Sequence, residues 1–520
     1  MGAAMRVGEL LGSLSLATDL GSGVPFEKGL RTCVVASVLT SEMELDSADR
    51  RAAYYAALLR SLGCTATSPE FSSLFEDDVA VQRELKTIDF GDPGVFASQL
   101  ERFGSWAGED RRQELGSRFV EVLPAEGPAL GRAGCEVSAA LGGQLGLPQG
   151  AIEALDEVYE RWDGMGFPEQ RAGEQLTIAA RVVHVAEQAV MAHFDGGSEA
   201  ARAEVARRSG GHLDPAVCAA FTEHADAVFE ALDSEDMLAA AVAREPAPVS
   251  HASAADLERI CRAFSAFADL KGTFLLGHSQ HVADLVDGAG ALLGVAAEDQ
   301  QRLRLAALLH DLGRVGIPSS VWDRPGPLGA ADWERVRLHP HWTGRILSRC
   351  AALGPLARLS AAHHERLDGT GYNHGARASE LSRDQRLLGA ADMFAALTEA
   401  RPHRPAFTPA QAARMLEDEV AAGRLDAECV GALVEAAGLP RVRAAWPCDL
   451  HTREVEVLRL VVRGLSNREI GEALFISART VQHHLASIYD KTGQRTRAGA
   501  AVFAMNHGLV LAGPGDPLDG

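Results

Sequence analysis

Histidine and acidic residues that could hold metal ions gather in one stretch of the chain. Eight of the eighteen histidines fall between positions 271 and 375, and three of them stand beside an acidic residue or a second histidine, in His310-Asp311 and His363-His364. Imidazole and carboxylate groups suit iron, manganese, zinc or cobalt. Two such metals about 3.5 to 4 Å apart can share a bridging water and clamp the attacking and leaving oxygens of a phosphoryl transfer. The stretch therefore predicts a metal site that hydrolyses phosphate esters.

The elements that position these residues are expected to be helices. Apolar residues recur mostly at helical spacing, and alternating β-branched runs are scarce, so we predict an all-α fold. A chain of 520 residues is expected to hold about three domains. Polar stretches with proline at 244–253 and 438–450 are typical of linkers. They separate three blocks, which we call the first (1–243), second (254–440) and third (450–512).

Composition favours an ordered, soluble, cytoplasmic protein. Hydrophobic residues make up 47% and charged residues 23% of the chain, which argues against disorder. No apolar run approaches the roughly 18 residues of a membrane helix, and the N-terminus lacks a signal-peptide pattern, so no membrane partner is expected. The eight cysteines include no CxxC pair. We expect buried thiols in a reducing compartment rather than disulfides or a structural zinc site.

The first block repeats the second. AALLRSLG (56–63) matches AALLHDLG (306–313) at six of eight positions, and YERWDGMGF (159–167) lies over HERLDGTGY (364–372). At the matching positions of the first block nearly every possible metal ligand is replaced, so we expect a non-catalytic domain. Its residues there are Lys28, Arg60, Ser61, Val158, Tyr159 and Glu187.

An insertion interrupts the first block at about 70–130. Ninety-nine residues separate Arg60 from Tyr159, against 54 between His310 and His364 in the second block. The insertion contains no motif that indicates a function. A structural or dimerising role is the hypothesis for the first block as a whole.

A series of motifs follows the histidines through residues 275–405. They are HSQHV from His278, HDLGRVGIP (310–318), PGPL (325–328), HPHWTG (339–344), HHERLDGTGY (363–372), Asp392 of AAD and RPHRP (401–405). Together they resemble the HD-GYP subgroup of the HD phosphohydrolase superfamily. The resemblance implies a helical domain with two or three metals that hydrolyses cyclic di-GMP to the linear dinucleotide or to GMP.

The resemblance also implies seven metal ligands, with Asp311 bridging two metals and with Asp311 and Arg314 as the catalytic residues. The family often has a glutamate four residues before its first histidine, where this chain has Phe274. We therefore expect two divalent ions, iron or manganese, rather than three. The implied ligands are His278, His310, Asp311, His339, His363, His364 and Asp392.

Further departures from the family pattern concern the substrate. Arg314 replaces the lysine of the usual HDxGK, which keeps the positive charge but presents a planar fork. Asn373 replaces the proline of the GYP triplet, which is expected to loosen that loop. Arg401 and Arg404 are candidate contacts to a substrate phosphate, with ordinary surface salt bridges as the alternative.

The third block differs from the rest in charge. From position 450 to 512 it has seven Arg and one Lys against five acidic residues, a net +3, whereas the whole chain carries −21. Val455, Leu458 and Val462 predict one helix face, and Ser466 and Glu469 predict a capping box for a second helix. A third helix after Ser477 would bury Val481, Leu485 and Ile488. The order is helix, turn, helix.

This block resembles the LuxR-type DNA-binding domain through TREVEVL, GLSNREI, KTG and the paired arginines that follow. The resemblance implies that the third helix enters the major groove of duplex DNA. Gln482 and His483 would face base edges, and a homodimer is expected because one short helix offers few contacts. A dimerisation module is the alternative. The implied phosphate contacts are Arg479, Thr480, Lys491, Arg495 and Arg497.

Two functions follow from these expectations. In the first, a metal-dependent phosphodiesterase is coupled to sequence-specific DNA binding. In the second, the chain is a transcription factor whose HD-GYP block binds a nucleotide with little or no hydrolysis. The complete set of implied ligands favours the first, and the substitutions at Phe274, Arg314 and Asn373 favour the second.

Overall fold

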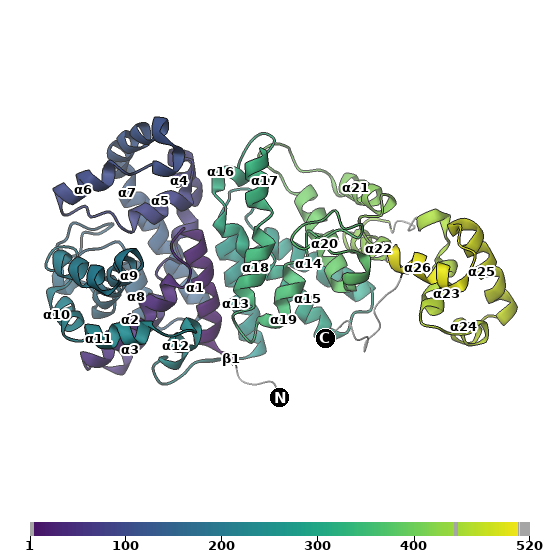
Figure 1. Ribbon diagram of the computed structural model, residues 1–520, viewed down its shortest axis with the longest axis horizontal. Helices are drawn as coiled ribbons and strands as arrows, with labels where there is room; N and C mark the ends of the chain where they lie inside the picture. Colours follow the sequence, from purple (N-terminus) through teal and green to yellow (C-terminus); the bar gives the residue numbers. More distant parts are fainter. Residues whose placement is uncertain (1–4, 441–445, 508, 510–520) are drawn as a thin grey trace. The chain divides into compact units, whose positions relative to one another are not determined.

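The computed structural model describes residues 5–440, 446–507 and 509, and these are predominantly helical (Figure 1). The strands it describes, β1 (Met5–Arg6) and β2 (His251–Ala252), form one short antiparallel pair. The predicted all-α fold is confirmed. Residues 441–445 of the second predicted linker, and positions 508 and 510–512 of the third block, lie outside the described residues.

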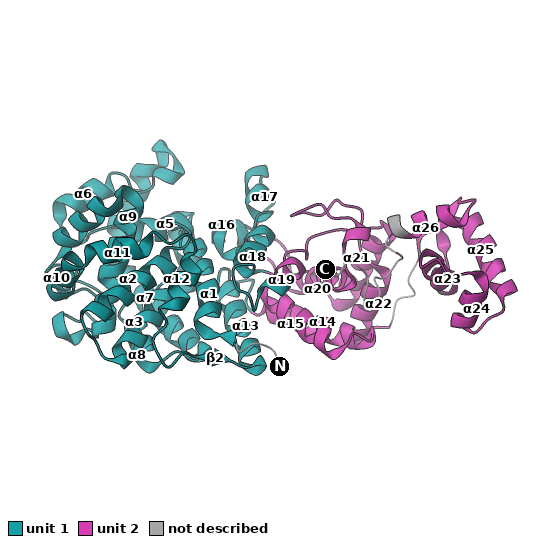
Figure 2. Ribbon diagram, turned by 60° about the horizontal axis from the view of Figure 1, so that its bottom comes forward, with its two compact units in different colours: residues 1–276, 311–355 teal, residues 277–310, 356–520 magenta. Residues whose placement is uncertain are grey.

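The chain divides into two compact units (Figure 2). Unit 1 comprises residues 1–276 and 311–355, and unit 2 comprises residues 277–310 and 356–520. Because this division falls within the second block, the domain boundaries drawn from the sequence stay a prediction. Among the helices of the described residues, none combines the length and apolarity needed to cross a membrane.

Three helices build the core of the first block within unit 1. They are α2 (Lys28–Glu42), α3 (Ser47–Leu59) and α9 (Ile178–Arg208), and each packs against the other two. The Asp46 carboxylate begins α3 by accepting hydrogen bonds from the next free backbone N–H groups. Residues 52–59 of this helix are all buried, so apolar packing on every side stabilises it.

Equivalent helices build the core of unit 2. These are α14 (His278–Leu292), α15 (Ala297–Leu309) and α20 (Arg383–Thr398), with α22 (Ala427–Ala436) packed against α14 and α20. Ser382 begins α20 with a capping box. Helices α2 and α14 have 15 residues each, and α3 and α15 have 13 each, as the internal repeat predicts.

The other helices complete the two units. Those of unit 1 are α1 (Val7–Gly21), α8 (Gln149–Asp156), α10 (Pro215–Glu223), α11 (Ala225–Leu232), α12 (Met237–Ala243), α13 (Ala254–Asp269), α16 (Ser319–Trp322), α17 (Ala330–Val336) and α18 (His339–Leu347). Unit 2 adds most of α19 (Gly354–Ser360) and α21 (Pro409–Ala421).

The insertion of the first block forms its own small core. It supplies α4 (Ser68–Phe75), α5 (Asp78–Leu85), α6 (Pro93–Leu100) and the start of α7 (Glu109–Leu145). Aromatic rings fill this core, and the Phe103 and Phe119 ring centroids lie 4.3 Å apart. Aromatic packing of this kind stabilises a subdomain without leaving a motif of chemical residues in the sequence.

The stretch 244–253 is more firmly fixed than its linker-like composition suggests. Glu245 is buried, and its carboxylate accepts hydrogen bonds from the Tyr55 hydroxyl at 2.6 Å and from the Arg6 guanidinium. β2 pairs with β1 next to it. One buried carboxylate therefore ties this stretch to the first block, and the linker assigned from the sequence stays a prediction.

The cysteines are free thiols, as expected. Seven are buried, and burial raises the pKa of Cys135 to about 12 and that of Cys218 to about 11. Cys448 is the exception, because it is exposed.

The third block folds as the predicted helix-turn-helix. Its helices are α23 (Thr452–Val462), α24 (Asn467–Leu474), α25 (Ala478–Thr492) and α26 (Arg497–Asn506). Ser466 and Glu469 form the expected capping box of α24, and Ser477 accepts a hydrogen bond from the Thr480 backbone N–H to begin α25. Of the apolar residues predicted to face inward, Val455, Leu458, Val481, Leu485 and Ile488 are buried and Val462 is half-buried.

Candidate metal centre and DNA-binding helix

Asp392, in the middle of α20, is the point on which three histidines of unit 2 converge. His278 at the start of α14 places its Nε2 atom 3.1 Å from Asp392 Oδ1. The Nε2 atom of His310 lies 3.6 Å from the same oxygen, and His364 Nδ1 lies 3.6 Å from Oδ2. His363 joins the group, because its ring packs against those of His310 and His364.

Two of these rings are oriented by the backbone. His310 Nδ1 and His363 Nδ1 each lie 2.7 Å from the carbonyl oxygen three residues earlier. A carbonyl only accepts, so Nδ1 carries the proton and Nε2 is the ring nitrogen with a lone pair for a metal. In unit 1 His339 uses the same arrangement at 2.6 Å. Such fixed tautomers are typical of histidine ligands.

His278 is oriented by a side chain instead. Its Nδ1 atom lies 2.8 Å from Glu399 Oε2, and His281 Nδ1 lies 2.9 Å from Glu399 Oε1. Arg401 donates to Glu399 Oε2 at 2.9 Å. Burial alone would raise the pKa of Glu399, but these partners outweigh it and lower the pKa to about 2. Glu399 was not predicted to belong to the site, because a single glutamate carries no signal in the sequence.

The electrostatics of Asp392 suit a cation. Burial alone would raise its pKa, but the imidazoles of His278, His310 and His364 that face the carboxylate lower the pKa well below the ordinary value. The carboxylate is therefore ionised while almost fully buried. Ligand atoms of His278, His310 and Asp392 lie within 4.8 Å of one another, a donor set of two imidazoles and one carboxylate that fits a divalent transition metal.

Unit 1 contains the remaining predicted metal ligands, Asp311 and His339, together with Arg314. His339 Nε2, at the start of α18, lies 3.3 Å from Asp311 Oδ1, and both residues are buried. Arg314, in a short 3-10 turn (Leu312–Gly316), pairs with the Asp311 carboxylate and stacks on the Trp322 ring at 4.9 Å. The Gly313 backbone N–H donates to Thr343 at 2.9 Å and fastens this turn to α18.

The loop after His364 is held in place despite the missing proline. The Glu365 carboxylate accepts hydrogen bonds from the His374 and Ala376 backbone N–H groups at 2.7 and 2.8 Å. Tyr372 stacks on His364 with ring centroids 4.5 Å apart. Asn373 adopts a φ of 103°, which asparagine tolerates better than most residues. The expectation of a loosened loop finds no support in these contacts.

Arg404, which is predicted to contact phosphate together with Arg314 and Arg401, makes backbone contacts in the structure. Its guanidinium donates to the carbonyl oxygens of Leu397 and Glu399 at 3.1 and 3.2 Å, where α20 ends. It also stacks on Phe407 at 4.8 Å. These contacts cap a helix, whereas Arg401 reaches the carboxylate that orients His278.

In the first block, side chains occupy the equivalent site. Lys28 Nζ forms an ion pair with Glu187 Oε1, and Arg60 Nε lies 2.7 Å from Glu187 Oε2. Lys86, from the insertion, adds a third cation 3.9 Å from the carboxylate and donates to Ser61 Oγ at 2.9 Å. Burial would raise the pKa of Glu187, but Arg60, Lys28 and Lys86 lower it far below 4.5.

The first block also lacks a counterpart of the seventh predicted ligand, His339. A Cβ atom on Gly313 would lie 2.2 Å from the His339 carbonyl oxygen, and one on Gly63 would lie 2.0 Å from that of Gly134. Both glycines follow the third helix of their block and permit the same close approach of a helix backbone. Gly134 thus takes the place of His339, a match that the insertion hides in the sequence.

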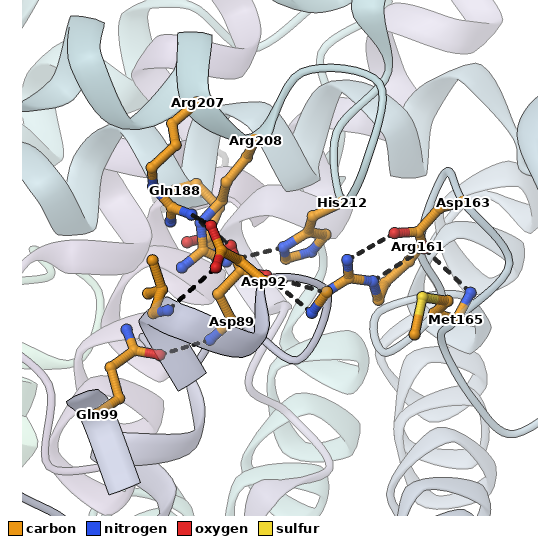
Figure 3. Close-up of polar contacts among 12 residues, drawn as sticks. Asp89, Asp92, Gln99, Arg161, Asp163, Met165, Gln188, Arg207, Arg208 and His212 are labelled. Carbon is orange, nitrogen blue, oxygen red and sulfur yellow. Dashed lines mark hydrogen bonds and ion pairs between the residues drawn. The ribbon is translucent and has the colours of Figure 1, made fainter. Parts of the chain in front are cut away.

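The insertion also forms an ion-pair network with the rest of the first block through Asp89 (Figure 3). This buried carboxylate accepts a hydrogen bond from Arg207 at 2.7 Å and lies 3.5 Å from Arg161 and 3.8 Å from Arg208. Arg161 also donates to Asp163, in the loop that matches 364–372. These ion pairs tie the insertion to the rest of the first block.

The third block presents one polar face on α25. Arg479, Gln482 and His483 are exposed and line a shallow surface hollow together with Asn467. Arg495 is also exposed. Thr480 is half-buried, and its hydroxyl lies 2.8 Å from Ser477 Oγ at the start of the helix. The residues predicted to meet DNA at the start of α25 therefore lie together.

Two of the predicted phosphate contacts are engaged within the domain. Lys491 forms an ion pair with the buried carboxylate of Glu454 at 2.8 Å and donates to a backbone carbonyl. Arg497 donates to Asn467 Oδ1 at 2.9 Å and to the Leu465 carbonyl oxygen. Both side chains stabilise the domain. The sequence alone does not distinguish this role from a contact with DNA.

Comparisons with known families agree with this division. Residues 262–429 match the family model described as HD domain, and residues 449–504 match the one described as bacterial regulatory proteins, luxR family.

Relatives cover both HD-like blocks. The chain is 30% identical over 439 residues to 3′3′-cGAMP-specific phosphodiesterase 3 of Vibrio cholerae, covering 83% of this chain and 94% of that protein. It is 36% identical over 183 residues to the cyclic di-GMP phosphodiesterase response regulator RpfG of Xanthomonas campestris, covering 34% and 46%. A crystal structure of a cyclic GMP-AMP specific phosphodiesterase of V. cholerae matches with a TM-score of 0.59 and 26% identity, covering 84% of this chain and 99% of that one. The chain therefore belongs to the HD-GYP-type family of cyclic dinucleotide phosphodiesterases and carries a LuxR-type domain after its second HD-like block.

Proposed function

We propose that the protein is a metal-dependent phosphodiesterase that hydrolyses a 3′3′-cyclic dinucleotide and couples this activity to DNA binding. The observation that carries the proposal is the buried carboxylate of Asp392, which faces His278, His310 and His364. The first block lacks every one of these ligands and contributes no reaction.

We propose two divalent metals held by the seven residues that the family resemblance implies. His310 and Asp311 are consecutive, so the chain itself brings the Asp311 carboxylate next to a histidine ligand, and Asp311 would bridge the two ions. When bound, such metals lower the pKa of a shared water and stabilise charge on the phosphate oxygens. The nature of the donors favours iron or manganese over softer metals.

The arginines would bind and orient the substrate. Arg314 is fixed between Asp311 and the Trp322 ring, so its planar fork is held ready for a phosphate oxygen. Arg401 would supply a second phosphate contact. Arg404 stays a candidate, but its helix-capping contacts favour a structural role.

The substrate class follows from the relatives. The relative that covers both blocks is named for 3′3′-cGAMP, whereas several that cover about a third of the chain or less are named for cyclic di-GMP. We propose 3′3′-cGAMP as the first substrate to test and cyclic di-GMP, which the sequence motifs imply, as the second.

Helix α18 offers a matched pair of variants for the test. His339 is buried against Asp311, whereas His341, two residues later, is exposed. Full-length protein loaded with Mn²⁺ or Fe²⁺ is incubated with each dinucleotide, and the products are separated by chromatography. His339→Ala and Asp311→Ala should lose metal and turnover, and His341→Ala should keep both. Equal turnover in the first two variants and wild type would overturn the proposed site.

A sensor without turnover is the second candidate function. It is favoured by Phe274 in place of the family's glutamate and by Arg314 in place of its lysine. Binding measured by calorimetry on the same protein separates the two. Tight dinucleotide binding without product would select the sensor, and product formation would select the enzyme.

For the third block we propose binding of a homodimer to duplex DNA through α25. The exposed Arg479, Gln482 and His483 at its start support this proposal. A gel shift of the full chain on genomic DNA fragments should show binding that weakens with salt. Failure to retard any fragment at low salt would count against it.

A further inference from the structure

Glu399 joins three side chains of unit 2 through one carboxylate. It lies just after α20 ends and accepts from His278 Nδ1, His281 Nδ1 and Arg401. Its side chain is 22% exposed, whereas that of His278 is 1% exposed, so its contact with His278 is the sheltered one. His281 is 40% exposed, and a pair so open to solvent contributes little.

His278 differs from the other histidines of the centre in how its ring is held. His310, His339 and His363 each donate Nδ1–H to the carbonyl oxygen three residues earlier, at or near the end of a helix. His278 is the first residue of α14, and Gly277 before it has a φ of 80°, so no preceding helical turn supplies that carbonyl. Glu399 provides the acceptor that the backbone does not.

We propose that Glu399 is a positioning residue that fixes His278 as a metal ligand and links it to the phosphate-binding Arg401. The inference rests on the proposed function of the metal centre. The His278 proton stays on Nδ1, where it is donated to Glu399, and the lone pair on Nε2 faces the side of Asp392. A carboxylate partner also makes an imidazole a more basic ligand.

The Glu399 carboxylate also connects His278 to Arg401. Arg401 and His278 share the same carboxylate oxygen, Oε2, so a movement of either side chain changes the partner of the other. Loss of Glu399 should therefore weaken metal binding and substrate binding together. Loss of Arg401 alone should raise KM and leave metal affinity unchanged.

The test compares Glu399→Ala and Glu399→Gln with Glu419→Gln in the full-length protein. Glu419 in α21 is a matched control, because it belongs to the same unit and its carboxylate is 20% exposed, close to the 22% of Glu399. It is paired with Arg424. Mn²⁺ affinity is measured by calorimetry and metal content by elemental analysis, without substrate. Glu399→Ala should weaken Mn²⁺ binding about 10- to 100-fold. Glu399→Gln, which can still accept from Nδ1, should recover part of the loss.

Each outcome decides one point. Wild-type Mn²⁺ affinity in Glu399→Ala would overturn the inference, and so would an equal loss in Glu419→Gln or a loss of melting temperature with no partial recovery by Glu399→Gln. If the wild type hydrolyses no dinucleotide but Glu399→Ala still loses metal, the positioning role stands and the proposed substrate fails. If the wild type does hydrolyse a dinucleotide, steady-state kinetics separate a fall in kcat through His278 from a rise in KM through Arg401.

Discussion

Lys28 and Glu187 form a buried ion pair at the two positions where the second block has His278 and Asp392. Both side chains of the pair are 1% exposed, and Arg60 contacts the same carboxylate at 2.7 Å. A buried carboxylate needs compensating charge. In the first block protein cations provide it, and in the second block we assign that part to metal ions.

We expect Glu187→Gln to destabilise the protein strongly. The substitution leaves Lys28, Arg60 and Lys86 close together without their shared anion, and removing one partner of a buried pair costs about 3–5 kcal/mol. Chemical denaturation followed by circular dichroism measures the loss.

An exposed carboxylate serves as the control for this variant. Asp226 is fully exposed and pairs with Arg202 on the surface, so Asp226→Asn should destabilise the protein much less than Glu187→Gln. Similar losses of unfolding free energy in the two variants would contradict the stabilising role of the buried Glu187 pair.

The pH dependence of this pair has a definite sign. The pKa of Glu187 in the folded protein lies below its ordinary value of 4.5, so folding favours the ionised form. The stability it contributes is complete above about pH 4.5 and is lost as the pH falls further toward the folded pKa. The difference in unfolding free energy between wild type and Glu187→Gln should shrink between pH 6 and about pH 3. A difference that stays constant or widens on acidification would contradict this sign.

Features with local sequence signals could be predicted from the sequence. Helical spacing and the Ser466 cap indicated the helix-turn-helix, and the repeat of AALLRSLG indicated the second copy of a helical core. These signals work because periodicity and capping act within a few residues.

Features that depend on distant contacts could not be predicted. Glu399 meets His278 across 121 residues, and Asp89 meets Arg207 across 118. Each is an ordinary charged residue in the sequence and becomes informative only when the fold supplies its partner. For the same reason the sequence did not show that Lys491, Arg497 and Arg404 bind groups of the protein itself.

Metal should stabilise the second block and not the first. A ligand that binds only the folded state at 100 times its Kd adds about 2.7 kcal/mol. The melting temperature should therefore be higher with Mn²⁺ than with a chelator, both in the wild type and in Glu187→Gln. The difference should vanish in Asp392→Ala, because that variant lacks the carboxylate on which three histidines converge. A metal-dependent shift that survives in Asp392→Ala would exclude this carboxylate as a ligand.

Arg479→Ala and Lys491→Ala should have different effects on the third block. Arg479 is exposed at the start of α25, so its loss should weaken DNA binding across sequences and reduce the slope of log K against log salt by about 1. Lys491 is paired with buried Glu454, so its loss should lower the melting temperature of the domain and leave the salt slope unchanged. Titration of labelled duplex by anisotropy at several salt concentrations, together with thermal unfolding, measures both quantities. A reduced salt slope in Lys491→Ala with unchanged melting temperature would show that Lys491 leaves Glu454 to meet a phosphate.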